Sequence, residues 1–152
     1  MEPGGFLCMR KYFAIAILLG ILCPSSIYAS TIKSFYGVTA TIPDGWEFQQ
    51  GEQVIIYSSS SDDENGGAVI VDRAPNDAGS ADTVVENLAD AVCVKRDEIS
   101  RDESGALYIN FVQEGEPVCV RVLDVNSSVL MVYTYGTNPI GREISMSIKP
   151  QK

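Results

Sequence analysis

The chain has 152 residues, with 11 Lys and Arg against 20 Asp and Glu and no His, and its net charge at pH 7 is −9. Such an acidic chain repels phosphate backbones, so we expect no nucleic-acid binding. The absence of histidine excludes Ser-His-Asp and Cys-His hydrolases, histidine-ligated zinc and histidine proton shuttles.

Residues 1–29 have the three-part order of a cleavable signal peptide. Two basic residues, Arg10 and Lys11, precede an apolar run of 12 residues, and a short segment containing a proline follows it. A span of the hydrocarbon core needs about 20 apolar residues, so the run is too short for a transmembrane anchor. We predict cleavage between Ala29 and Ser30, export to the periplasm or the medium, and no stable membrane insertion after cleavage.

Two details of the leader stay open. Met9 could be the true start, which would place the two basic residues at the usual position. Cys23 closes the apolar run and could carry lipid, although Leu22 before it is larger than the side chain that lipoprotein processing prefers. Residues 30–152 then form a single globular domain with 9 basic and 19 acidic residues, a net charge of −10.

The first half of this domain carries four predicted strands, at 36–42, 46–48, 53–58 and 68–73. Pro43-Asp44-Gly45 is a turn sequence that separates the first two strands. The polar connection at 58–67 predicts a hairpin between the last two. Asp63 and Asn65 in this connection have part of the spacing of a calcium loop, but strands flank it, so we expect no metal site.

One long helix is predicted between residues 83 and 96, because apolar residues recur along one helical face at Val84, Val85, Leu88, Ala91 and Val92. Thr83 and Glu86 have the spacing of a capping box. Lys95 and Arg96 would lie in the last turn, where cations favour the negative end of the helix dipole.

The second half predicts three strands joined by hairpin-length connections, at 106–113, 117–125 and 129–135, which should form an antiparallel meander. For residues 139–148 a helix and a strand both stay open. Asn138-Pro139 is typical of a helix start, whereas Ile144, Met146 and Ile148 alternate as in a strand, and we favour the helix. The predicted fold class is α+β, an antiparallel sheet with one long central helix and a short C-terminal helix packed on it.

Cys93 and Cys119 are the cysteines outside the leader. An oxidising compartment favours a disulfide between them, which would join the long helix to the middle strand of the meander. A bridge closing a loop of about 25 residues would add about 3 kcal/mol to the stability. The alternatives are two free buried thiols or a redox pair, for which the usual Cys-x-x-Cys spacing is absent.

The strand at Tyr36–Ile42 ends in Pro43-Asp44-Gly45-Trp46, and a central helix, a strand meander and a closing Ser145–Lys149 follow it. This arrangement resembles the DcrB-like and PsbP-like families of small exported proteins. The resemblance implies an α/β sandwich around an antiparallel sheet, used as a binding or assembly module. The resemblance assigns no catalytic residues to this sequence.

We therefore expect an exported, non-enzymatic binding or accessory domain that needs no cofactor and whose partner is another exported or envelope protein. An aromatic binding surface could be formed by Trp46, Phe48, Tyr133 and Tyr135, although such residues are more often core. One rival is an immunity or inhibitor protein whose acidic surface neutralises a secreted toxin or hydrolase. Another is a carboxylate-dependent glycan hydrolase, which needs only two suitably spaced acidic residues.

Overall fold

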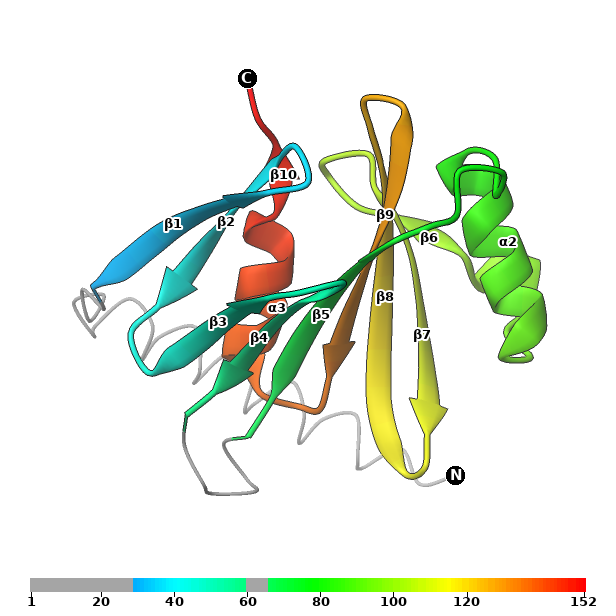
Figure 1. Cartoon of the computed structure of the whole chain (residues 1–152). Coiled ribbons are helices and arrows are strands. Elements are labelled where there is room, and N and C mark those ends of the chain that lie inside the picture. Colours follow the sequence, from blue (N-terminus) through cyan, green and yellow to red (C-terminus); the bar gives the residue numbers. More distant parts are fainter. Residues whose placement is uncertain (1–28, 60–65) are drawn as a thin grey trace.

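The structure, a computed structural model, describes residues 29–59 and 66–152, which form two antiparallel sheets and two α-helices (Figure 1). The large sheet has the strand order β3 (Trp46–Gln50), β4 (Val54–Ser58), β5 (Ala68–Arg73), β9 (Ser128–Tyr135), β8 (Glu116–Val125), β7 (Leu107–Gln113) and β6 (Ser100–Arg101). The small sheet has the order β1 (Ser30–Phe35), β2 (Val38–Pro43) and β10 (Lys149–Pro150). The predicted α+β class is confirmed. The leader with Met9 and Cys23, and most of the partial calcium loop, lie outside the described residues.

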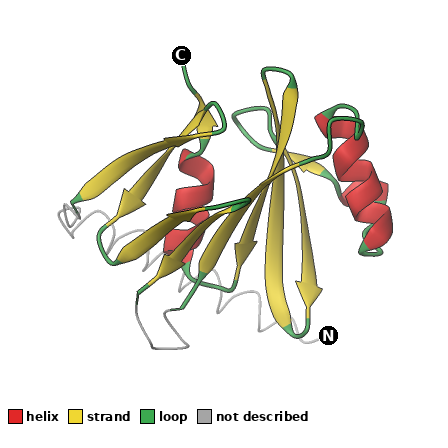
Figure 2. Ribbon diagram, in the orientation of Figure 1, coloured by secondary structure: helices red, strands yellow, loops and turns green. Residues whose placement is uncertain are grey.

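The two helices pack on opposite faces of the large sheet. Helix α2 (Ala81–Ala91) covers β7 and β8, while α3 (Pro139–Ser147) and the small sheet cover the other face (Figure 2). Along β8 the valines at 118, 120 and 122 join the core beneath α2, and Leu123 and Val125 join the core beneath α3. We call these faces the α2 face and the α3 face. In the part of the chain that is described, neither helix is long and apolar enough to cross a membrane.

The N-terminal strand prediction at 36–42 is only partly correct. The structure has β1 and β2, paired from Ser30 opposite Pro43 to Phe35 opposite Val38. Tyr36 and Gly37 form the turn between them, with φ of 49° and 78°. In β1 only Phe35 is buried, so this strand has no alternation that a hydrophobic pattern could reveal.

The predicted ends of the long helix are wrong. Ser80 is the N-cap, and its side chain accepts a hydrogen bond from the Thr83 N–H, so Thr83 and Glu86 do not form the capping box. The helix ends at Ala91, and the chain then turns through Cys93, which has a φ of 60°. Arg96 therefore lies beyond the last turn and folds back to pair with Glu86 and Asp90 at 3.3 and 3.0 Å.

The meander and the final helix are confirmed. Strands β7, β8 and β9 pair in sequence order, and Asn138 caps α3, since its side chain accepts a hydrogen bond from the Ile140 N–H at 3.0 Å. Ile144 and Ile148 are each 1% exposed, whereas Met146 between them is 44% exposed. The apparent alternation at 144–148 therefore reflects one buried helical face rather than a strand.

Candidate functional site

The four aromatic residues predicted as one binding surface are divided between the two faces of the large sheet. Trp46 is only 9% exposed and joins Phe48 in the core beneath α3. Tyr133 and Tyr135 lie on the α2 face, where their rings stack with centroids 6.3 Å apart. Strand alternation causes this separation, so the prediction of one shared surface is wrong.

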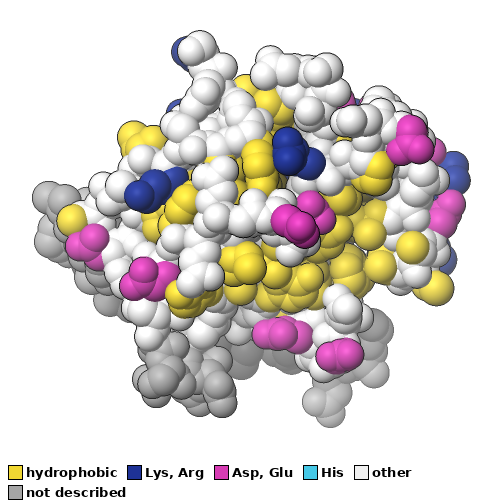
Figure 3. Space-filling model, in the orientation of Figure 1, with side chains coloured by type: hydrophobic (Ala, Val, Ile, Leu, Met, Phe, Trp, Pro, Cys, Tyr) yellow, Lys and Arg dark blue, Asp and Glu magenta, His cyan; other side chains and the backbone are white. Residues whose placement is uncertain are grey.

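The α2 face is only partly covered by its helix. Half-buried apolar side chains of β4, β5 and β9 lie on this face and alternate along each strand with core residues of the α3 face; they are Ile55, Tyr57, Ile70, Met131, Tyr133 and Tyr135. Figure 3 shows hydrophobic side chains gathered across this side of the molecule.

The predicted disulfide is also wrong in this structure, where Cys93 and Cys119 are both free thiols. Cys119 alternates in β8 with Val118 and Val120, which pack beneath α2, so its side chain lies on the α3 face. Cys93 follows the C-terminus of α2 and is exposed. The sheet therefore separates the two sulfur atoms, and the bridge cannot join α2 to β8.

Alkylation of the purified protein without reductant, followed by mass-spectrometric mapping, should label Cys93 rapidly and Cys119 slowly. Burial raises the pKa of the Cys119 thiol, against the opposing charges of Arg142 and Arg121, and a thiol with a raised pKa reacts more slowly. Reductant should leave the melting temperature unchanged. A fall on reduction equivalent to about 3 kcal/mol would instead indicate a bridge.

A groove with a cavity volume of about 1060 Å³ lies on the α3 face, between α3 and the β7–β8 part of the large sheet. Its floor comes from alternate residues of neighbouring strands, in which Asn110 lies opposite Cys119 and Cys119 lies opposite Thr134. Its wall is the side of α3 that carries Pro139, Arg142, Ser145 and Met146. The groove exists because the nine residues of α3 lie against β2, β5 and β9 and leave β7 and the Pro117–Cys119 end of β8 uncovered.

A buried ion pair between Arg121 and Asp102 closes one end of the groove. The Arg121 Nε lies 2.8 Å from the Asp102 Oδ2, and the two side chains are 3% and 7% exposed. Arg121 also donates to the Ser104 Oγ at 3.3 Å and to the backbone carbonyl of Ser145. One guanidinium thus links β8, the loop between β6 and β7, and α3.

The surroundings of Asp102 keep it ionised. Burial raises the pKa of this carboxyl, but hydrogen bonds from Ser104 and Arg121, the charge of Arg121 and the Ala106 N–H outweigh burial, and the net pKa lies below its ordinary value. A glycosidase general acid needs a raised pKa. The arrangement therefore offers no support to the hydrolase alternative at Asp102.

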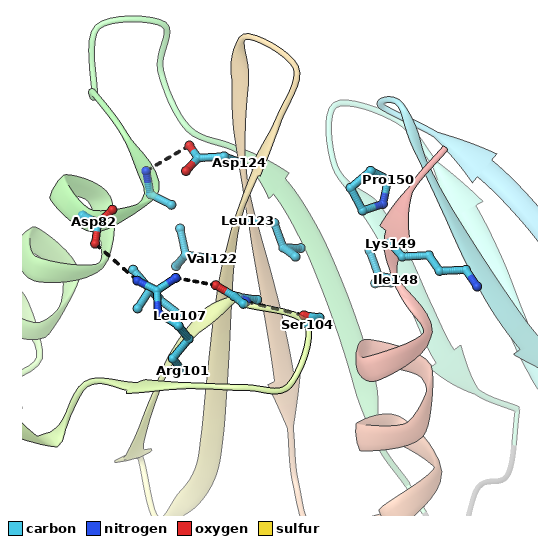
Figure 4. Close-up of a pocket in the computed structure, with 13 residues that line it drawn as sticks. Asp82, Arg101, Ser104, Leu107, Val122, Leu123, Asp124, Ile148, Lys149 and Pro150 are labelled. Carbon is cyan, nitrogen blue, oxygen red and sulfur yellow. Dashed lines mark hydrogen bonds and ion pairs between the residues drawn. The ribbon is translucent and has the colours of Figure 1, made fainter. Parts of the chain in front are cut away.

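The loop that carries Asp102 is held from its other side by Arg101. The Arg101 guanidinium lies 3.8 Å from the Asp82 carboxylate of α2 and donates to the Gly105 carbonyl at 2.6 Å. Figure 4 shows this arginine between α2 and the loop, beside a small cavity that also reaches Lys149 and Pro150. Both ends of the loop are therefore tied to neighbouring elements, which fixes Asp102 beneath Arg121.

Unpaired polar groups distinguish the groove from the rest of the described chain. Within that part, the buried side-chain oxygens or nitrogens without a hydrogen-bond partner are the Thr134 Oγ1 and the Ser145 Oγ, and both residues line the groove. They are 7% and 2% exposed. Arg142 lines the same groove and makes no ion pair with any described residue. Buried hydroxyls are normally paired, so this concentration marks a candidate ligand site.

None of these groove residues was predicted from the sequence to belong to a binding site. Cys119 was considered only as half of a disulfide. A signal was present in β8, where Cys119 and Arg121 interrupt the run of valines on alternate positions. Both therefore had to lie on one face of the strand. Their proximity to Thr134 and Arg142 depends on the strand order and on the placement of α3, which no local pattern gives.

No protein-family model matches the chain, and no curated protein sequence is significantly similar to it. A crystal structure of a protein from Bacteroides thetaiotaomicron is similar over 81% of this chain, with 12% identity and a TM-score of 0.52. The match covers 48% of that protein, so this chain spans about half its length.

The solution structure of cyanobacterial PsbP (CyanoP) from Synechocystis matches 84% of this chain and 96% of that one, with 16% identity and a TM-score of 0.49. A crystal structure of a Pseudomonas aeruginosa protein of unknown function matches 81% and 98%, with 18% identity and a TM-score of 0.43. At such identities similarity concerns the fold alone. Membership of the DcrB-like or PsbP-like families stays a prediction from the sequence.

Proposed function

We propose that the protein is an exported, non-enzymatic binding domain that acts in the periplasm or the medium, and that its groove holds a carboxylate group of another exported or envelope protein. The observation that carries the proposal is the presence of two buried hydroxyls without partners, on Thr134 and Ser145, beside the uncompensated Arg142. Each unsatisfied buried polar group costs about 1–3 kcal/mol, and a ligand that accepts hydrogen bonds from both would recover part of this cost.

A carboxylate matches this set better than a polyanion does. A guanidinium can bind the two oxygens of a carboxylate in parallel, and a hydroxyl can donate a hydrogen bond to a carboxylate oxygen. Arg101 pairs with Asp82 and Arg121 pairs with Asp102. Arg142 is therefore the groove arginine that has no carboxylate partner among the described residues. The net charge of −10 on residues 30–152 also opposes ligands with many negative charges.

The groove is also suited to a polypeptide rather than to a small molecule. Its cavity volume of about 1060 Å³ lies just above the range of small-molecule pockets, about 300–1,000 Å³. Val112 and Met146 line it with 70% and 44% of their surface exposed. Exposed apolar side chains beside polar groups occur at protein interfaces.

Titration of the ¹⁵N-labelled protein with sodium acetate at pH 7 tests the carboxylate site, with sodium chloride at equal ionic strength as the reference. We expect chemical-shift changes at Thr134, Ser145 and Cys119, with a Kd of about 1 mM or weaker, because one carboxylate offers few contacts. Both Arg142→Gln and Thr134→Val should weaken this binding.

Arg96→Gln is the matched control for Arg142→Gln, because it removes the same charge from an arginine that pairs with Glu86 and Asp90 outside the groove. It should leave the acetate response unchanged. Equal responses from the Arg142 and Arg96 variants, or shift changes confined to residues outside the groove, would contradict the proposed site.

A further inference from the structure

The outer edge of the large sheet is open along most of β7. Strand β6 has only two residues, Ser100 and Arg101, which pair with Tyr108 and Leu107. Before β6 the chain leaves the edge as a 3₁₀-helix at Arg96–Glu98. Within the described part of the chain, residues 109–113 therefore have a partner strand only on the β8 side.

One hydrogen bond shows to which neighbouring strand each residue of β8 directs its backbone N–H and C=O groups. The Pro117 carbonyl accepts a hydrogen bond from the Gly136 N–H at 3.0 Å, so the polar backbone groups of Pro117 face β9. Successive residues of a strand direct these groups to opposite sides, so those of Val118 face β7. Phe111 lies opposite Val118 and faces back towards β8.

It follows that Asn110 and Val112 direct their backbone N–H and C=O groups away from β8, to the open edge. A separate contact supports this assignment. Ala106 precedes β7 and, like Asn110 and Val112, has an even number, so its backbone groups should also point outward. Its carbonyl does accept a hydrogen bond from the Asp102 N–H on the outer side, at 2.9 Å. Asn110 and Val112 also line the groove. The outward backbone groups therefore belong to two residues that line the groove.

This edge lacks the usual protection against strand pairing. Leu107–Gln113 contains no charged residue, no proline and no glycine, and the Val112 side chain is 70% exposed. Native proteins commonly protect such an edge with lysine, proline, a bulge or a covering loop. An uncharged open edge beside a groove with unpaired polar groups is the geometry that strand addition uses.

The unpaired arginine of the groove favours a strand that carries a carboxylate. Three arginines line the groove together with Asp102 and Glu103, and two of the three are paired, Arg101 with Asp82 and Arg121 with Asp102. Arg142 forms no ion pair with a described residue, so its charge favours an added strand that brings a carboxylate to the α3 face.

We propose that an extended acidic segment of another exported protein adds to β7 as a further strand, pairing with the outward backbone groups of Asn110 and Val112. Every second side chain of the added strand faces the groove, so one of them can bring a carboxylate towards Arg142 while an apolar one contacts Met146. This inference rests on the proposed carboxylate site and adds the backbone recognition beside it. The carboxylate is an Asp or Glu side chain or the C-terminus of the partner.

A displayed library of random peptides, selected on the immobilised full protein, supplies the probe. The best peptide is then synthesised with a free and with an amidated C-terminus, and with each acidic residue replaced by its amide, which separates the two carboxylate sources. Methylation of single backbone nitrogens of this peptide should weaken binding about tenfold at alternate positions and leave the positions between them unchanged.

On the protein side, Val112→Pro removes an outward N–H without removing a hydrogen bond of the β7–β8 ladder, and proline is tolerated on edge strands. It should weaken the peptide about tenfold, whereas Val112→Ala, which keeps the N–H, should weaken it less. The peptide scan needs no substitution in the protein, so the test stands even if Val112→Pro fails to fold.

The outcomes separate this inference from the proposed function. Strand addition is overturned if N-methylation is tolerated equally at every position of the peptide, or if no peptide is selected, while acetate still binds through Arg142. The carboxylate site then still stands. If the native protein shows no response to acetate, both the carboxylate site and strand addition are overturned. Sedimentation that shows a dimer which Val112→Pro converts to a monomer identifies a second copy of this chain as the occupant, and that result also overturns an acidic partner strand.

Discussion

Replacing Asp102 with alanine should lower the free energy of unfolding by about 3–5 kcal/mol at pH 7, because it leaves the charge of Arg121 buried without a partner. Arg121 is 3% exposed and cannot move to solvent without releasing α3 and the loop between β6 and β7. Urea denaturation followed by fluorescence measures the effect, since Trp46 is the single tryptophan and lies in the core.

Asp82→Ala is the matched control, because Asp82 is 68% exposed and lies 3.8 Å from Arg101. It should cost no more than about 1 kcal/mol. A similar loss from both variants would show that the Arg121–Asp102 pair has no special role in holding the groove together.

The stabilisation that Asp102 gives to the fold should also decrease at low pH. Its pKa is lower in the folded protein than the ordinary value of about 3.9 for an unfolded chain, so its ionised form stabilises the fold. This contribution is complete above about pH 4 and is lost as the pH falls through the lower pKa of the folded state. The stability difference between the native protein and Asp102→Ala should therefore narrow below about pH 4.

Replacing Ile144 with alanine should cost about 2–5 kcal/mol, because its side chain is 1% exposed and packs in the core beneath α3. Since Arg142 and Ser145 lie on the same helix, loosening α3 should also weaken acetate binding. Denaturation and the acetate titration measure the two effects. Glu143→Ala, an exposed change on α3, should leave both nearly unchanged, and an equal loss from the two variants would contradict the role of Ile144.

The sequence predicts the elements whose signals are local. The meander follows from alternating strands joined by hairpin-length connections, and α3 follows from its Asn138-Pro139 start. In contrast, β6 and β10 have two residues each and exist only because the fold brings them beside β7 and β2. Tertiary pairing defines these strands, so local propensity cannot reveal them.

The wrong predictions for the site share one physical cause, the side of the large sheet on which a residue lies. A disulfide between Cys93 and Cys119 agreed with the number of cysteines, and the aromatic surface agreed with the composition. The first failed because Cys119 alternates with the valines beneath α2, and the second because the large sheet separates Trp46 from Tyr133. The helix ends were wrong because Ser80 caps α2 earlier than expected and Cys93 adopts a left-handed backbone conformation.

The groove could not be derived from the sequence. Its polar residues come from β7, β8, β9 and α3, and it is open because a short helix covers only part of a wide sheet. Arg121 inside an apolar strand was a detectable sign of a buried partner. Identifying that partner as Asp102 required the position of the loop between β6 and β7.

The measurement that tests the central claim most directly is the effect of Thr134→Val on stability and on acetate binding in the same samples. If the Thr134 hydroxyl is buried without a partner and serves a ligand, the apolar replacement of similar shape should raise the free energy of unfolding by about 1 kcal/mol and weaken acetate binding. A fall in stability would show that the hydroxyl already has a partner in the folded protein. Unchanged acetate binding would contradict its role in the groove.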